Sequence, residues 1–82
     1  MTRFEQKKLD SEFNRFTKMN FDKPQKCTSI GQIRYYMKEL EDRIVFLKHS
    51  VKYVPNAAYA LMSQYNAAQN KLIHKNFQDV YL

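Results

Sequence analysis

A regular spacing of apolar residues through the middle of the chain constrains the fold more than any other feature. From residue 30 to residue 54 the interval between apolar positions alternates between three and four without a break. This spacing puts every member on one stripe of an α-helix and is the heptad pattern of helices that pack knobs-into-holes. It predicts one helix over residues 30–54 with a coiled-coil-like seam. The seam consists of Ile30, Ile33, Met37, Leu40, Ile44, Leu47, Val51 and Val54.

Capping signals predict where the first two helices begin. Thr2 and Glu5 have the T-x-x-E spacing of a capping box, and Pro24 disfavours helical backbone just before it. A first helix is therefore expected over about residues 3–20. Ser29 and Gln32 repeat the capping arrangement and mark the start of the helix over residues 30–54, with Thr28 as a competing cap one residue earlier.

A third helix is expected directly after the second. Pro55 ends the preceding helix, and Asn56 is a favourable N-cap for a helix over about residues 56–79. The apolar face of this helix again follows intervals of three and four and then shifts in phase, as in a coiled-coil stutter. Its positions are Ala58, Leu61, Tyr65, Ala68 and Leu72, followed by Ile73, Phe77 and Val80.

These elements predict an all-α protein, because the chain has only one Gly and two Pro and so lacks the turn residues of a many-stranded fold. The short connection makes the helices over 30–54 and 56–79 antiparallel neighbours. The helix over 3–20 offers Leu9, Phe13 and Phe16 on one arc and should dock on this hairpin. We expect a three-helix bundle, or a long helical hairpin with a docked N-terminal helix, as a single domain over residues 1–82.

Composition indicates a basic cytoplasmic protein. The chain has 14 Lys and Arg against 8 Asp and Glu, a net charge of +6, which favours nucleic acid or acidic protein surfaces. The first residues have no apolar stretch that resembles a secretory signal, and the longest apolar run, residues 44–47, is far short of a membrane span. The lone Cys27 agrees with a reducing compartment.

The basic residues fall on two helix faces. On a helical wheel the first helix presents one arc of Lys and Arg opposite its apolar side, with Phe4 inside the arc, where its ring can stack on a base. A second basic edge follows the helix over residues 30–54, where Glu39 and Arg43 are expected to form an i,i+4 ion pair. The candidate nucleic-acid-binding residues are Arg3, Lys7, Lys8, Arg15, Lys18, Arg34, Lys38, Lys48 and Lys52. The alternative interpretation is an ordinary solvated charged face.

The leading functional hypothesis is a small regulatory or accessory protein that binds RNA or DNA through phosphate contacts. The alternative is a protein-interaction module or inhibitor that docks on an acidic partner. The enrichment in Lys, Asn, Tyr, Phe and Ile is typical of AT-rich genomes and agrees with a bacteriophage origin. Because the seam is so regular, a homodimer or higher oligomer is also expected. The alternative is that the third helix covers the seam within one chain.

Catalysis, metal binding and cofactor binding are not expected from this sequence. Cys27, His49 and His74 fall on three separate elements and lack the spacing of metal ligands. No small-molecule substrate is indicated either, because a small helical bundle lacks the concave site that substrates require.

One local resemblance concerns the third helix. The segment from Tyr65 to Leu72 resembles a stretch of the small helical haemolysin-expression-modulating family, which acts on nucleoid proteins. The acidic position of that stretch is Gln69 here, and the distance back to Cys27 is longer than in the family. No functional residue is carried over from the resemblance.

Overall fold

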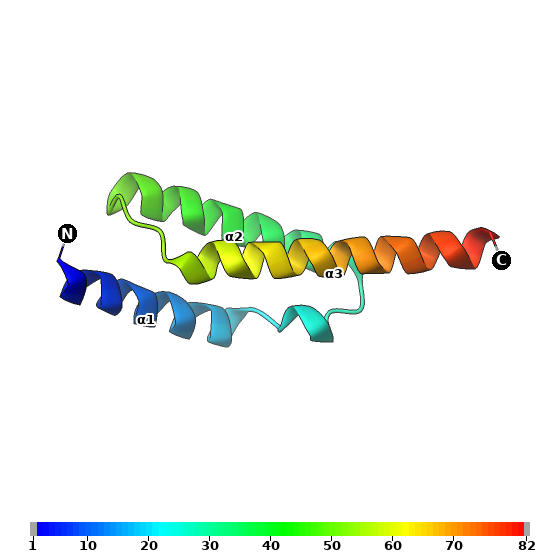
Figure 1. Cartoon of the computed structure of the whole chain (residues 1–82), viewed down its shortest axis with the longest axis horizontal. Coiled ribbons are helices and arrows are strands. Elements are labelled where there is room, and N and C mark those ends of the chain that lie inside the picture. Colours follow the sequence, from blue (N-terminus) through cyan, green and yellow to red (C-terminus); the bar gives the residue numbers. More distant parts are fainter. Residues whose placement is uncertain (1, 82) are drawn as a thin grey trace.

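The computed structural model describes the backbone of residues 2–81 and the side chains of residues 2–75. The described chain forms helices α1 (Arg3–Asn20), α2 (Ile30–Ser50) and α3 (Asn56–Tyr81), with a short 3₁₀ helix, η1 (Pro24–Lys26), between α1 and α2. α2 runs antiparallel to α3, and α1 lies along the other side of α3 (Figure 1). The predicted all-α three-helix architecture is confirmed.

Two of the three predicted N-caps, Thr2 and Ser29, act at the helix starts, whereas Asn56 is the first residue of α3 itself. The Thr2 hydroxyl accepts a hydrogen bond from the Glu5 backbone N–H at 3.2 Å, and the Ser29 hydroxyl accepts one from the Gln32 N–H at 3.4 Å. Each bond satisfies a backbone donor that the first turn of a helix leaves without a partner. The sequence therefore located the beginnings of α1 and α2 correctly.

The end of α2 differs from the prediction. The helix stops at Ser50, Val51 is its C-cap, and Lys52 has a left-handed φ of 55°. The expected continuation to Val54 was wrong: the backbone leaves the helix at Lys52, and in a continued helix Pro55 could not donate to the carbonyl of Val51 and its ring would clash with it. The seam nevertheless continues, since Val51 and Val54 are half-buried and pack against the core from outside the helix.

The core forms mainly where the α2 seam meets α3. In α2, Ile33, Leu40 and Leu47 are buried one heptad apart, and in α3 Ala58 and Tyr65 are buried, again one heptad apart. The remaining seam residues Ile30, Met37 and Ile44 are half-buried. The seam of α2 is thus covered within the chain by α3 and α1 and is not an open stripe. Phe13 of α1 and Cys27 complete the buried set.

An aromatic cluster ties the end of α1 to the other two helices. The ring of Phe21 lies 5.2 Å from that of Tyr36 and 6.4 Å from that of Tyr65. The carboxylate of the next residue, Asp22, accepts hydrogen bonds from the Tyr36 hydroxyl at 3.1 Å and the Gln32 amide at 3.0 Å. The Tyr65 hydroxyl donates to the Asp22 backbone carbonyl. One short segment therefore fixes the position of η1 relative to both α2 and α3.

α3 continues past the N-terminal end of α2 and makes the molecule elongated, with extents of 55 × 21 × 16 Å (Figure 1). The predicted face of α3 is confirmed as far as Leu72, because Leu61, Ala68 and Leu72 are half-buried. Ile73, the first position after the predicted phase shift, is 41% exposed and is not part of the core. Phe77 and Val80 lie outside the residues whose side chains are described.

Candidate nucleic-acid interface

The outer face of α1 carries the predicted basic arc. Its inner face packs on the bundle through buried Phe13, with Leu9 and Phe16 half-buried beside it. This anchoring turns the opposite side of the helix toward solvent, as expected for an amphipathic helix. The side chains of Arg3, Lys7, Lys8, Arg15 and Lys18 are all exposed there.

An exposed aromatic ring accompanies these cations. Phe4 is 78% exposed, the highest value among the large hydrophobic side chains described. At 100° per residue Phe4 falls between Lys7 and Lys8 on the wheel of α1, inside the basic arc. A ring that is solvated rather than packed is available to stack on a flat partner such as a base.

The three carboxylates of α1 border the basic arc and do not interrupt it. Glu5 and Glu12 are exposed on one flank. On the other flank the Asp10 carboxylate accepts a hydrogen bond of 2.8 Å from the Tyr53 hydroxyl, which comes from the α2–α3 connection. This hydrogen bond, partial desolvation and the charge of Asp10 raise the pKa of Tyr53 above its ordinary value. Asp10 is thereby held toward the bundle.

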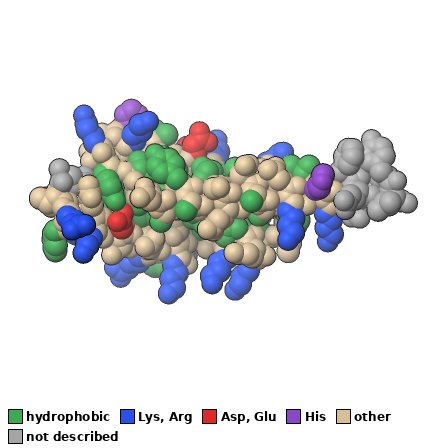
Figure 2. All heavy atoms as spheres, viewed as in Figure 1, with side chains coloured by type: hydrophobic (Ala, Val, Ile, Leu, Met, Phe, Trp, Pro, Cys, Tyr) green, Lys and Arg blue, Asp and Glu red, His purple; other side chains and the backbone are tan. Residues whose placement is uncertain are grey.

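The second predicted basic edge is also exposed but lies elsewhere. Arg34, Lys38, Lys48 and Lys52 are all exposed. Figure 2 shows Lys and Arg side chains along the edge that α1 forms and others over α2 at the opposite edge, so the two sets do not merge into one patch in this view. Lys52 lies outside the helix, because α2 ends at Ser50 and Lys52 has a left-handed backbone.

Further cations lie between the helices. Lys23 and Lys26 are exposed at η1, which follows α1 directly. In the sequence they belong to the segment around Pro24, where no periodic pattern indicates which way side chains point. They extend the positive charge of α1 beyond its C-terminal end.

Arg43 is placed differently from the prediction. Its guanidinium carbon lies 4.7 Å from the ring centroid of Phe16 and 5.3 Å from that of Phe46. Its buried Nε has no hydrogen-bond partner and therefore makes no bond to Glu39. Arg43 therefore links α2 to α1 through a cation–π contact with Phe16. Its Nε takes no part in the expected ion pair with Glu39.

Cys27 is 7% exposed and packs in the core beside η1. Its thiol lies 3.5 Å from the backbone carbonyl of Lys23. Burial, and secondarily the negative charge of Asp22, raises the pKa of the Cys27 thiol. A raised pKa favours the protonated thiol over the nucleophilic thiolate. Cys27 is therefore a packed core residue that its surroundings do not activate as a nucleophile.

No protein-family model, curated protein or solved structure matches the chain. Within the described residues, His, Cys, Asp and Glu side chains do not gather in any group of three that suits a metal ion. None of the helices, over their described length, combines the length and apolar character needed to cross a bilayer.

Proposed function

We propose that this protein is a small regulatory or accessory protein that binds nucleic acid, RNA or DNA, through the outer face of α1. The observation that carries the proposal is Phe4, a ring left 78% exposed among the exposed cations of one helix. A solvated charged face does not require an apolar ring in its middle. A nucleic-acid ligand uses both chemistries, because phosphates pair with cations and bases stack on rings.

The expected mode of binding follows from the dimensions of α1. Its 18 residues extend over roughly 27 Å at 1.5 Å per residue. Lys and Arg side chains along this length would replace condensed counterions on a phosphate backbone, so affinity would fall steeply as salt rises. Contacts of this kind carry little sequence information. Stacking by Phe4 would add a preference for single strands, whose bases are accessible.

Fluorescence anisotropy with labelled single-stranded RNA, single-stranded DNA and duplex DNA across a salt series tests the proposal. The triple variant Lys7→Glu, Arg15→Glu, Lys18→Glu should lose most of the affinity and flatten the salt dependence, with helicity by circular dichroism unchanged. The matched control reverses three cations of α2, Arg34, Lys38 and Lys48, which changes the net charge by the same amount. Equal losses from both triple variants, or no binding at low salt, would contradict the assignment to α1.

The role of Phe4 has a separate test. Phe4→Ala should weaken binding to single strands by roughly 1–3 kcal/mol, the range for one base stacked on an aromatic side chain, while duplex binding stays unchanged. Phe46→Ala removes another exposed ring, 55% exposed, from α2 and is the control. An unchanged affinity of Phe4→Ala for single strands would leave a purely electrostatic interface.

A second candidate function is docking on an acidic partner protein. The observation that favours it is an open hollow of about 1130 Å³ between η1 and α3, with Lys71 and Lys75 among its lining residues. The two functions use different surfaces, so one protein can bridge nucleic acid and a protein target.

We also propose that the protein self-associates, through the outer face of α3 and not through the α2 seam as expected from the sequence. The α2 seam is covered within the chain and is not available to another copy. Residues 53–70 contain no charged residue, and Figure 2 shows only uncharged side chains over the middle of α3. In a chain of net charge +6, this outer face of α3 is where a second copy would meet the least repulsion.

A further inference from the structure

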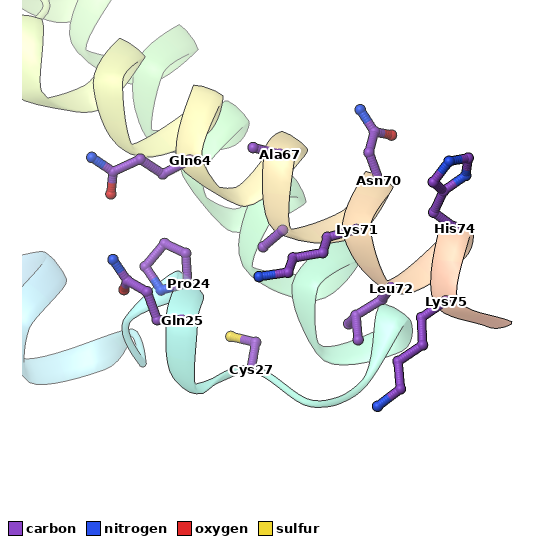
Figure 3. A pocket seen from close by; sticks show the side chains of 11 residues that line it. Pro24, Gln25, Cys27, Gln64, Ala67, Asn70, Lys71, Leu72, His74 and Lys75 are labelled. Atoms are coloured by element: carbon purple, nitrogen blue, oxygen red, sulfur yellow. The ribbon is translucent and has the colours of Figure 1, made fainter. Parts of the chain in front are cut away.

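A furrow runs along one side of α3, next to η1. Its larger part is the hollow of about 1130 Å³, where Pro24 and Cys27 face Ala68 and Leu72. Pro24 and Cys27 are buried, and Ala68 and Leu72 are half-buried, so the floor is apolar. In Figure 3 the Cys27 thiol points into the space between η1 and α3, whereas Asn70 and His74 point away from it.

A smaller hollow of about 380 Å³ prolongs the furrow toward the start of α3. It shares Pro24, Gln25 and Gln64 with the larger hollow and reaches Leu61. Together the two hollows follow α3 from Leu61 to Lys75, which is roughly 21 Å of helix at 1.5 Å per residue. This length matches about four turns of a second helix laid alongside α3.

The charges around the furrow are almost all positive. Lys71 and Lys75 line the larger hollow, and Lys18 and Lys23 line the smaller one. Figure 3 shows Lys71 extending from α3 toward η1 across the open space. Asp22 is the one acidic residue among the described lining residues, and its carboxylate already accepts hydrogen bonds from Gln32 and Tyr36. The furrow therefore combines an apolar floor with a cationic rim.

We propose that this furrow binds an acidic amphipathic α-helix of a partner protein. The apolar face of that helix would cover Pro24, Ala68 and Leu72, and its flanking carboxylates would pair with Lys71 and Lys75, as in helix-in-groove recognition. A phosphate backbone would leave the apolar floor without a partner. A second copy of this chain, with its charge of +6, would be repelled by the cationic rim. The inference rests on the second candidate function, and of the α1 residues proposed to bind nucleic acid only Lys18 also lines the furrow.

Binding of a designed peptide to the full-length protein tests this inference. The probe is a labelled peptide of about five helical turns with Leu on one face and Glu on both flanks; the control peptide has Lys in place of Glu. The acidic peptide should bind, and in ¹H–¹⁵N spectra it should shift the amide signals of residues 25–27 and 61–75. The basic peptide should not bind.

Variants separate the two parts of the site. Lys71→Glu with Lys75→Glu should weaken peptide binding by roughly tenfold or more, because both cations that line the larger hollow are reversed. Lys48→Glu with Lys52→Glu, at the far end of α2, changes the net charge equally and should leave the affinity within about twofold, as expected for remote, screened charges. Ala67→Arg adds a positive charge but places bulk in the larger hollow. Weaker binding by this variant would identify contact with the furrow itself.

Three results would overturn the inference. One is shifts confined to α1, which would mean that the peptide is attracted only by the basic arc. Another is the absence of binding by the acidic peptide while nucleic acid still binds, which would leave the proposed function of α1 intact. The third is competition in which a short oligonucleotide shifts the furrow signals and displaces the peptide, which would assign the furrow to nucleic acid.

Discussion

The hydroxyl of Tyr53 donates a hydrogen bond of 2.8 Å to the carboxylate of Asp10. Tyr53 lies in the connection between α2 and α3, and Asp10 lies near the middle of α1. The bond joins residues 43 positions apart in the chain and holds one flank of α1 against the α2–α3 hairpin. Together with the burial of Phe13, it fixes the rotation of α1 about its own axis, with the basic arc facing solvent.

Removing this contact should loosen α1. Tyr53→Phe keeps the ring and deletes the donor, so the midpoint of urea denaturation should fall, and amide exchange in α1 should become faster than in α2. Tyr59→Phe is the control, because Tyr59 is 53% exposed on the outer side of α3 and should tolerate the change. Equal midpoints for Tyr53→Phe and Tyr59→Phe would show that Asp10 contributes nothing to the docking of α1.

Stability should fall at alkaline pH, and Tyr65 should be the main cause. Burial, followed by the nearby charges of Cys27, Tyr36 and Asp22, raises the pKa of Tyr65 above its ordinary value of 10.0. Because the folded state holds this proton more tightly than the unfolded state, the contribution of Tyr65 is fully present below pH 10 and is lost as pH rises through the higher folded pKa. The pKa values of Tyr53 and Cys27 are also raised and act in the same direction.

The variant Tyr65→Phe tests this assignment. At neutral pH it should cost about 1 kcal/mol for the lost hydrogen bond to the Asp22 carbonyl. Above pH 10 its free energy of unfolding should decline less steeply than that of the unaltered protein. Parallel pH profiles for the two proteins, measured by urea titration at several pH values, would rule out Tyr65 as the source.

Replacement by Gly should have opposite effects on stability at Lys52 and at Lys48, which are four residues apart. Lys52→Gly relieves a left-handed φ of 55° that Gly adopts without strain and should stabilise the fold by up to about 1 kcal/mol. Lys48→Gly lies in the last turns of α2 and should destabilise it by about 1 kcal/mol. Each variant removes one positive charge, so the difference between their thermal midpoints isolates the backbone effect. A destabilised Lys52→Gly variant would be inconsistent with the turn described.

Sedimentation over a range of concentrations tests self-association through the outer face of α3. The unaltered protein should form dimers or larger species, and Ser63→Glu, which puts a charge in the middle of the uncharged stretch, should shift it toward monomer. Ser11→Glu makes the same change on α1 and should leave the association unchanged. A protein that stays monomeric at high concentration would contradict this part of the proposal.

The sequence was sufficient for most of the fold because helix signals are local. Capping by Thr2 and Ser29 and the seam from Ile33 to Leu47 depend on residues within one or two turns of each other. The end of α2 was missed for a physical reason, since Val51 and Val54 keep the apolar spacing whether or not the backbone between them is helical. Only the preference at the residue before Pro55 pointed to an earlier end.

The surface was less predictable, because it depends on contacts between elements. Helical spacing correctly placed the α1 cations on the exposed side. Helical spacing failed for Arg43, because the i,i+4 rule considers neighbours within one helix. The aromatic neighbours of Arg43 come from two helices, Phe16 from α1 and Phe46 from α2. The furrow could not be predicted at all, because its two walls, η1 and α3, lie about 40 residues apart and are brought together through Asp22 and Tyr65, which are 43 positions apart.

The α2–α3 hairpin forms between neighbouring segments of the chain, whereas α1 is held by contacts between distant residues. This difference should determine the order in which the helices fold. α2 and α3 are separated by five residues and share most of the core, so their pairing closes a short loop and should be fast. We therefore expect α1 to join, through the contacts of Asp10 and Asp22, only after the hairpin has brought Tyr53 and Tyr65 into position. A tryptophan reporter at position 16 should then report a later phase in stopped-flow refolding than one at position 46. Simultaneous phases would mean that the three helices condense together.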